Sequence, residues 1–176
     1  APDSRHAQMA TLSGKRIVEM AWTDLRIRDI VDAHAIDNAV TTVLALGGST
    51  NAAVHLIAVA RRAGVPLDLA RFDALSRRTP VLADIRPAGR FLMEDFFYAG
   101  GLRGLLSRIP DLLALEALTV TGATLGENLA GAVVHNDEVI RPRGKPIVAS
   151  GGLAVLTGNL APRGADLTPP AMAPRP

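Results

Sequence analysis

The sequence predicts an α/β fold in which several short helices surround a small sheet. Two observations support this prediction. Apolar residues recur at helical spacing between residues 32 and 63, and short apolar runs follow later, close to proline or glycine. With 176 residues, 48% of them apolar, the chain is long enough for one domain with a buried core and too apolar for wholesale disorder.

The clearest helical pattern lies between Asp32 and Leu46, with Asp32 as the expected N-cap. Its apolar positions are Ala33, Ile36, Val40, Val43 and Leu44. Gly47 and Gly48 are expected to end this helix, because glycine adopts the left-handed backbone conformation that helix ends require. Ser49 or Thr50 then caps a second helix, which ends near Gly64.

The remaining elements are shorter. Residues 1–16 are expected to be the end of a helix that began upstream, and residues 17–22 a short apolar turn. We expect helices over 69–77 (capped by Asp68), 91–98, 102–109 and 125–130, and strands over 81–85, 118–120 and 153–156. The last of these helices carries the capping-box spacing of Thr124 and Glu127. Residues 137–150 are expected to form a loop, and a proline-rich tail follows residue 165.

Composition excludes several classes of function. The sequence contains no cysteine, so it offers no disulfide, no thiolate nucleophile, and no thiolate ligand for zinc or an iron–sulfur cluster. The net charge is only +2 with both signs mixed along the chain, and aromatic residues make up 3%. We therefore expect no nucleic-acid partner. No apolar run reaches 18 residues and no signal peptide is evident, so we expect no membrane partner and a cytoplasmic location.

The turn Gly47–Asn51 is the main candidate binding site. Its glycines permit close approach of a ligand to the backbone, and a helix N-terminus presents N–H groups and a dipole that favour an anion. Ser49, Thr50 and Asn51 add short polar side chains at the same place. The alternative is an ordinary helix–turn–helix junction with standard caps, which uses the same residue types.

Other polar residues fit a structural role better than catalysis. Glu94 and Asp95 are adjacent on an expected helix and point about 100° apart, so we expect a solvated face or an ion pair with Arg90. His55 lies among apolar residues and is expected in the core, and none of the four histidines has metal-pair spacing. We therefore assign no catalytic residue and no metal ligand to this chain.

Six segments in order resemble one family, the dehydratases that include dihydroxy-acid dehydratase, phosphogluconate dehydratase and the sugar-acid dehydratases. These segments span residues 3–20, 47–56 (GGSTNAAVHL), 87–101 (PAGRFLMEDFFYAGG), 118–129 (LTVTGATLGENL), 137–142 (DEVIRP) and 151–162 (GGLAVLTGNLAP). Together they cover nearly the whole of residues 3–165. The variant Phe96-Phe97-Tyr98 looks nearer to the arabinonate-type sugar-acid branch than to the branched-chain amino-acid branch.

The resemblance implies a hydro-lyase that converts a 2,3-dihydroxy acid or sugar acid into a 2-keto-3-deoxy acid, with an iron–sulfur cluster and Mg²⁺ as cofactors of the full-length family. The cluster cysteines precede the matched region in that family, so we expect this chain alone to bind neither cofactor and to be inactive. Residues 1–165 would form part of a three-layer helix–sheet–helix N-terminal domain with a mixed or parallel sheet. Residues 166–176 would lie at the junction to a missing C-terminal domain.

The expected partners are a small hydroxy-acid substrate at Ser49, Thr50 and Asn51 and, for the full-length protein, further copies in a homo-oligomer. Two alternatives stay open. The chain is either a non-catalytic structural or interaction remnant, or a small-acid binding module that uses the Gly47–Asn51 turn without chemistry.

Overall fold

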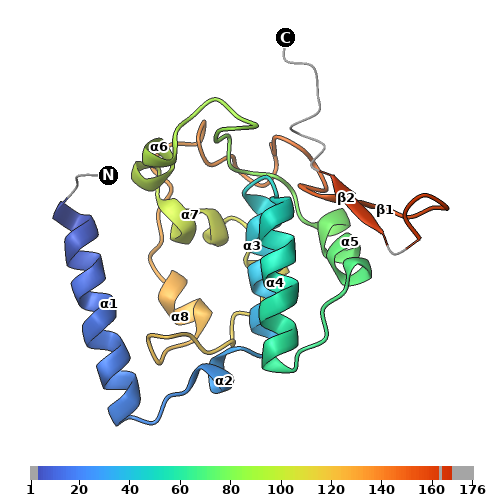
Figure 1. Ribbon diagram of the computed structural model, residues 1–176. Helices are drawn as coiled ribbons and strands as arrows, with labels where there is room; N and C mark the ends of the chain where they lie inside the picture. The colour runs from blue at the N-terminus through green and yellow to red at the C-terminus, as the bar shows by residue number, and fades with distance from the viewer. Residues whose placement is uncertain (1–3, 163, 168–176) are drawn as a thin grey trace.

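The computed structural model describes residues 4–162 and 164–167, and within them helices dominate (Figure 1). The helices are α1 Ser4–Trp22, α2 Ile27–Ile30, α3 Ala33–Ala45, α4 Thr50–Ala63, α5 Leu69–Arg78, α6 Met93–Tyr98, α7 Gly101–Ser107, the 3₁₀ turn η1 Pro110–Leu112 and α8 Leu125–Leu129. The strands β1 Ala154–Leu156 and β2 Ala165–Leu167 pair antiparallel, with Val155 opposite Asp166. The expected short helices are therefore present. The sheet of the described residues is this antiparallel pair, to which the expected strands over 81–85 and 118–120 do not belong, and the three-layer arrangement stays a prediction.

Helices α3, α4 and α5 form one half of the core. Val40 and Leu44 of α3, Ala53 of α4, and Phe72 and Leu75 of α5 are all buried, and Leu153 packs onto them just before β1. Local capping explains where these helices begin. Asp32, Ser49 and Asp68 each accept a hydrogen bond from the backbone N–H three residues later, as predicted for helix N-caps.

Residues 81–85 belong to the other half of the core. All five are buried, and they pack with α6, α7 and residues 139–140. Instead of a continuous strand ladder, this segment makes single bridges, from Val81 to Val148 and from Ala83 to Ile140. The backbone N–H groups of Leu82 and Ala83 both donate to the carbonyl of Ala45. The last residue of α3 therefore supplies the hydrogen-bond acceptor that a neighbouring strand would supply in a sheet.

The N-terminal helix is longer than expected. The prediction of a short turn over residues 17–22 is wrong, because α1 continues to Trp22. Arg16 and Met20 lie one helical turn apart and both face the rest of the molecule. Met20 is buried, and the Arg16 Nε donates to the carbonyl of Val120 at 2.6 Å. Helical continuity is what places both side chains on one face.

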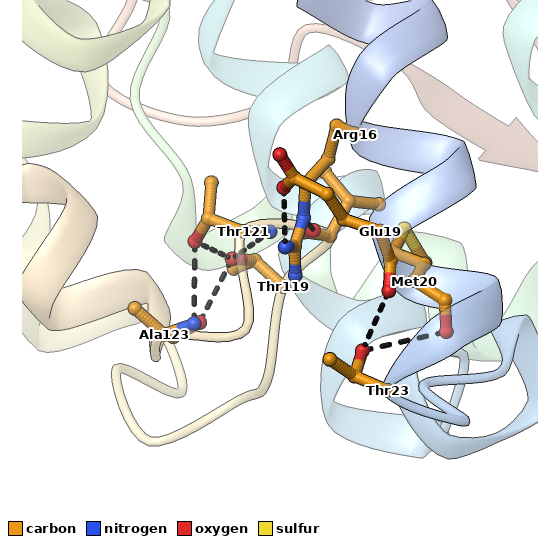
Figure 2. A network of polar contacts seen from close by, with 8 residues as sticks. Arg16, Glu19, Met20, Thr23, Thr119, Thr121 and Ala123 are labelled. Atoms are coloured by element: carbon orange, nitrogen blue, oxygen red, sulfur yellow. Dashed lines mark hydrogen bonds and ion pairs between the residues drawn. The ribbon is translucent and has the colours of Figure 1, made fainter.

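Figure 2 shows this attachment of α1. Arg16 also pairs with Glu19 at 3.1 Å, which holds the guanidinium in place beside the loop. Within the loop, the Thr119 hydroxyl donates to the carbonyl of Ala123 at 2.8 Å, and the Ala123 N–H donates to the Thr121 hydroxyl at 3.2 Å. The loop that receives Arg16 is therefore ordered by its own threonine side chains.

The expected helices over 91–98 and 102–109 appear as the shorter α6 and α7, and the helix after Thr124 appears with both bonds of its capping box. Residues 118–120 contribute only a bridge, from Leu118 to Thr124. None of the described helices combines the length and the hydropathy that a membrane span requires. The end of the proline-rich tail, from residue 168 onward, lies outside the described residues.

Candidate functional site

The Gly47–Asn51 turn joins α3 to α4. Both glycines have a positive φ, +117° at Gly47 and +81° at Gly48, which side-chain-bearing residues rarely adopt. Their N–H groups donate to the carbonyls of Leu44 and Val43, at 3.1 Å and 2.8 Å, and so close the end of α3. The chain then reverses at Ser49, whose hydroxyl accepts from the Ala52 N–H at 3.3 Å and caps α4.

A second glycine segment packs against the back of this turn. A β-carbon on Gly48 would overlap the carbonyl oxygen of Gly152, and a β-carbon on Gly152 would lie 2.6 Å from the carbonyl oxygen of Leu44. Residues 151–153 are held there by Ser76 on α5. Its carbonyl accepts from the Gly151 N–H at 2.9 Å, and its hydroxyl donates to the carbonyl of Leu153. The turn is thus supported from behind by direct backbone contact.

The three predicted site residues differ in exposure and in hydrogen bonding. The Ser49 hydroxyl oxygen is engaged in the cap, whereas the side chains of Thr50 and Asn51 are exposed and have no hydrogen-bond partner in the described part of the chain. The backbone N–H groups of Thr50 and Asn51 are also unpaired within that part. These N–H groups lie at the positive end of the α4 dipole and can donate hydrogen bonds to a carboxylate from solvent.

Asp84 is the centre of a second polar cluster, which we did not predict from the sequence. Its side chain is 10% exposed, and its carboxylate accepts from both the backbone N–H and the Nε of Arg90, at 2.9 Å and 2.8 Å. Arg141 lies at 3.7 Å from the same carboxylate, and Glu138 lies at 3.7 Å from Arg90. Hydrogen bonding to Asp84 raises the pKa of Arg90 above its usual value. The cluster is charge-balanced and closes the loop over residues 86–90.

The partners of Arg90 test the expectation that Glu94 or Asp95 forms an ion pair with it. Arg90 pairs with Asp84 and Glu138 and not with the adjacent acids of α6. Asp95 instead accepts from the Leu92 N–H at 2.7 Å and stabilises the start of α6, while Glu94 is exposed. A signal was present in the sequence, because an acid that precedes Arg-Pro-x-Gly-Arg is a candidate for closing that turn.

The expectation for His55 is wrong: its side chain is exposed on α4, because the core-facing positions of that helix are Ala53 and Ala60. The other histidines, His6, His34 and His135, are exposed as well. Within residues 4–162 and 164–167, no group of three or more acidic or histidine side chains comes together as a metal site would require.

Comparison with known proteins then assigns the family. The family described as "Dihydroxy-acid/6-phosphogluconate dehydratase N-terminal" matches residues 1–128. The chain belongs to this family. Its relatives include an L-arabinonate dehydratase of Rhizobium leguminosarum bv. trifolii, 46% identical over 98% of this chain, and an L-arabonate dehydratase of Azospirillum brasilense, 48% identical over 99%. A dihydroxy-acid dehydratase of Syntrophobacter fumaroxidans is 44% identical over 95% of this chain.

These dehydratases are much longer than the chain. The chain spans about 30% of the length of each of the three relatives. The match runs through all six of the segments that suggested the resemblance, including the Gly47–Asn51 turn and the residues around Gly152. The likeness therefore extends over the turn and the backbone that supports it.

Proposed function

We propose that this chain is part of a hydro-lyase that dehydrates a sugar acid of the arabinonate type to its 2-keto-3-deoxy acid. The observation that carries the proposal is 46–48% identity over 98–99% of the chain to dehydratases named for L-arabinonate. In this reaction a proton leaves C2 and the hydroxyl leaves C3. The resulting enol then becomes the 2-keto acid, so water is the one product besides the keto acid.

The residues of this chain do not fit the iron–sulfur cluster that the family resemblance implies. The sequence has no cysteine, so it offers no thiolate to the iron. The described residues also contain no group of three or more acidic or histidine side chains that could hold a metal ion. We therefore assign cofactor binding and the bond-breaking step to other parts of a full-length dehydratase, and expect the chain alone to be colourless and inactive.

The role proposed for this chain is to position the substrate at the Gly47–Asn51 turn. The unpaired N–H groups of Thr50 and Asn51 would hold the substrate carboxylate at the N-terminus of α4. The Asn51 amide, which can donate and accept, suits a neighbouring hydroxyl. Ser49 would act indirectly, since its hydroxyl caps α4 and keeps these donors in place. Support for this role comes from the exposure of Thr50 and Asn51 and from the rigid backing by Gly152.

In the full-length protein, we propose that residues 1–165 belong to a three-layer helix–sheet–helix N-terminal domain. The segment that begins at residue 166 would lead towards a C-terminal domain. The exposed apolar residues of α1, which include Met9, Leu12 and Trp22, support the presence of further covering structure. We also propose a cytoplasmic homo-oligomer, by analogy with enzymes of small-molecule metabolism.

The test is to express the complete reading frame that contains this chain and to assay it with L-arabinonate and with dihydroxyisovalerate. We expect the full-length protein to contain iron and to release the 2-keto-3-deoxy acid from L-arabinonate faster than it dehydrates dihydroxyisovalerate. The isolated chain should show neither iron nor turnover. Stoichiometric iron and turnover in the isolated chain would contradict the proposal, as would a complete protein inactive on both acids.

A further inference from the structure

A small hollow lies between α6 and residues 135–139, on the surface of the second half of the core. Its volume is about 230 Å³. One wall consists of Phe91, Asp95, Tyr98 and Ala99, which recur at helical spacing along α6 and its flanks. The other wall consists of His135, Asn136 and Val139. Below we refer to it as the α6 hollow.

Backbone contacts fix the two walls relative to each other. The His135 N–H donates to the carbonyl of Ala99 at 2.9 Å, directly across the hollow. Gly100 makes this approach possible, because its φ is +127° and a β-carbon there would lie 2.5 Å from the carbonyl oxygen of Val133. At the other end, the N–H groups of Phe91 and Asp84 donate to the carbonyls of Asp84 and Val139, at 3.0 Å and 2.9 Å. The shape of the hollow is therefore set by the fold.

The α6 wall presents one acceptor and one donor. One oxygen of Asp95 accepts from the Leu92 N–H, which leaves the other oxygen without a partner in the described chain. The Tyr98 oxygen accepts from the guanidinium of Arg5 at 2.9 Å, so its own hydroxyl proton is available to a ligand. Arg5 also lies over the Tyr98 ring, 5.3 Å from its centroid, which gives the Tyr98 side chain a second contact with α1.

The facing wall presents further donors. The Asn136 carbonyl oxygen accepts from the Glu138 N–H at 2.9 Å, which orients the amide and leaves its NH₂ unpaired among the described residues. The His135 imidazole has no side-chain partner there either, and it can donate from one nitrogen and accept at the other. Between the polar groups lie the apolar surfaces of Phe91 and of the buried Ala99 and Val139.

We propose that the α6 hollow binds a small neutral polyhydroxylated molecule of about pentitol size. Hydroxyl groups donate and accept at once, which matches the mixture of Asp95, Tyr98 and Asn136 around an apolar floor. A carboxylate ligand has acceptors only and would face the negative charge of Asp95. A divalent cation would find one acidic side chain among the lining residues, too few for a protein-held site. The volume lies below the roughly 300–1,000 Å³ of drug-sized sites, which favours a small ligand.

The experiment titrates xylitol into the isotope-labelled chain and follows the amide chemical shifts. We expect saturable shifts confined to residues 91–100 and 133–140, with an affinity on the order of millimolar for so few ligand atoms. Both Tyr98→Phe and Asn136→Asp retain the side-chain shape. Tyr98→Phe removes the hydroxyl, which is also the acceptor of the Arg5 bond, and Asn136→Asp replaces the NH₂ donor by a charged oxygen. Each should weaken binding by at least about fivefold, the loss expected for one hydrogen bond.

Asn159→Asp is the matched control, since it makes the same chemical change at an exposed loop position outside the hollow, and it should leave xylitol affinity unchanged. The amide spectra of every variant show directly whether it is folded. The proposal is overturned if xylitol produces no saturable shifts at these residues. It is equally overturned if Asn136→Asp binds as the parent does, or if L-arabinonate fills the hollow more tightly than xylitol. The experiment requires no catalytic activity, so its outcome is independent of the proposed dehydratase function.

Discussion

Gly48 and Gly152, 104 positions apart in the sequence, are in backbone contact, and neither has room for a β-carbon. Gly48 connects α3 to α4, and Gly152 precedes β1. Their contact therefore joins the α3–α4 pair to the strands β1 and β2. Gly48 is under two separate constraints, a φ of +81° and the neighbouring carbonyl of Gly152. Both requirements must be met for the Gly47–Asn51 turn to hold its shape.

Replacing Gly48 by valine should therefore destabilise the chain strongly. Backbone strain and displacement of residues 151–153 together should lower the free energy of unfolding by about 2–4 kcal/mol. Urea denaturation followed by circular dichroism measures the change. The matched control is Gly14→Ala in α1, where nothing lies within 4 Å of the added β-carbon. That substitution should stabilise the helix by about 0.5–1 kcal/mol, and an equal loss at both glycines would refute the contact argument.

Asn38 makes a long-range bond that should matter for stability. Its amide donates to the carbonyl of Ala114 at 2.9 Å and accepts from the Ala114 N–H at 2.8 Å, with the side chain 9% exposed. Asn38→Ala leaves both backbone groups unsatisfied and should cost about 2–3 kcal/mol. Thermal or urea unfolding of the isolated chain gives the value. Asn51→Ala, at an exposed amide without such bonds, should change stability by less than about 0.5 kcal/mol.

The capping box of α8 should make stability depend on pH. Hydrogen bonds from the backbone N–H and the hydroxyl of Thr124 lower the pKa of Glu127 below its usual value. A lowered pKa in the folded state means that the ionised carboxylate stabilises the fold above the ordinary pKa of glutamate. That contribution is lost as pH falls through the folded-state pKa.

Glu127→Gln should therefore shift the urea midpoint downward at neutral pH, and the difference from the parent should shrink on acidification. Glu116→Gln serves as the matched control, since that exposed glutamate makes no hydrogen bond through its side chain in the described part of the chain. A midpoint difference for Glu127→Gln that stays constant down to strongly acidic pH would show that ionisation of the capping box does not contribute.

The apolar surface of α1 predicts self-association of the isolated chain. Met9, Leu12, Ile17 and Val18 are each more than half exposed, and Trp22 is 85% exposed. Sedimentation velocity should show species that grow with concentration, because exposed apolar patches drive association. Substituting Leu12 and Trp22 together by glutamine should reduce it, whereas Thr11→Gln on the same helix should not. A compact monomer at every concentration would contradict the expectation.

The sequence allowed prediction of features that depend on neighbouring residues. Asp32, Ser49, Asp68 and the pair Thr124–Glu127 were identifiable as caps because each acts within three residues of its partner. The conformation of the Gly47–Gly48 turn followed from the same local logic.

Features that depend on distant partners could not be predicted. The Asn38 amide bonds to Ala114, 76 positions away, and residues 151 and 153, on either side of Gly152, bond to Ser76 on α5. His55 was assigned to the core from its apolar neighbours, but which face of α4 is buried depends on how α3 and α5 pack against it. The bridges from Val81 to Val148 and from Ala83 to Ile140 likewise depend on segments about 60 residues away.

We propose that Asn51 faces substrate in the full-length protein that contains this chain. The deciding measurement is kcat/KM for L-arabinonate in the full-length Asn51→Ala variant, with its melting temperature recorded beside that of the parent. We expect kcat/KM to fall by at least about tenfold, equivalent to about 1.4 kcal/mol of transition-state binding, with the melting temperature unchanged. Unchanged activity together with a melting temperature several degrees lower would show that Asn51 serves only the structure of the turn.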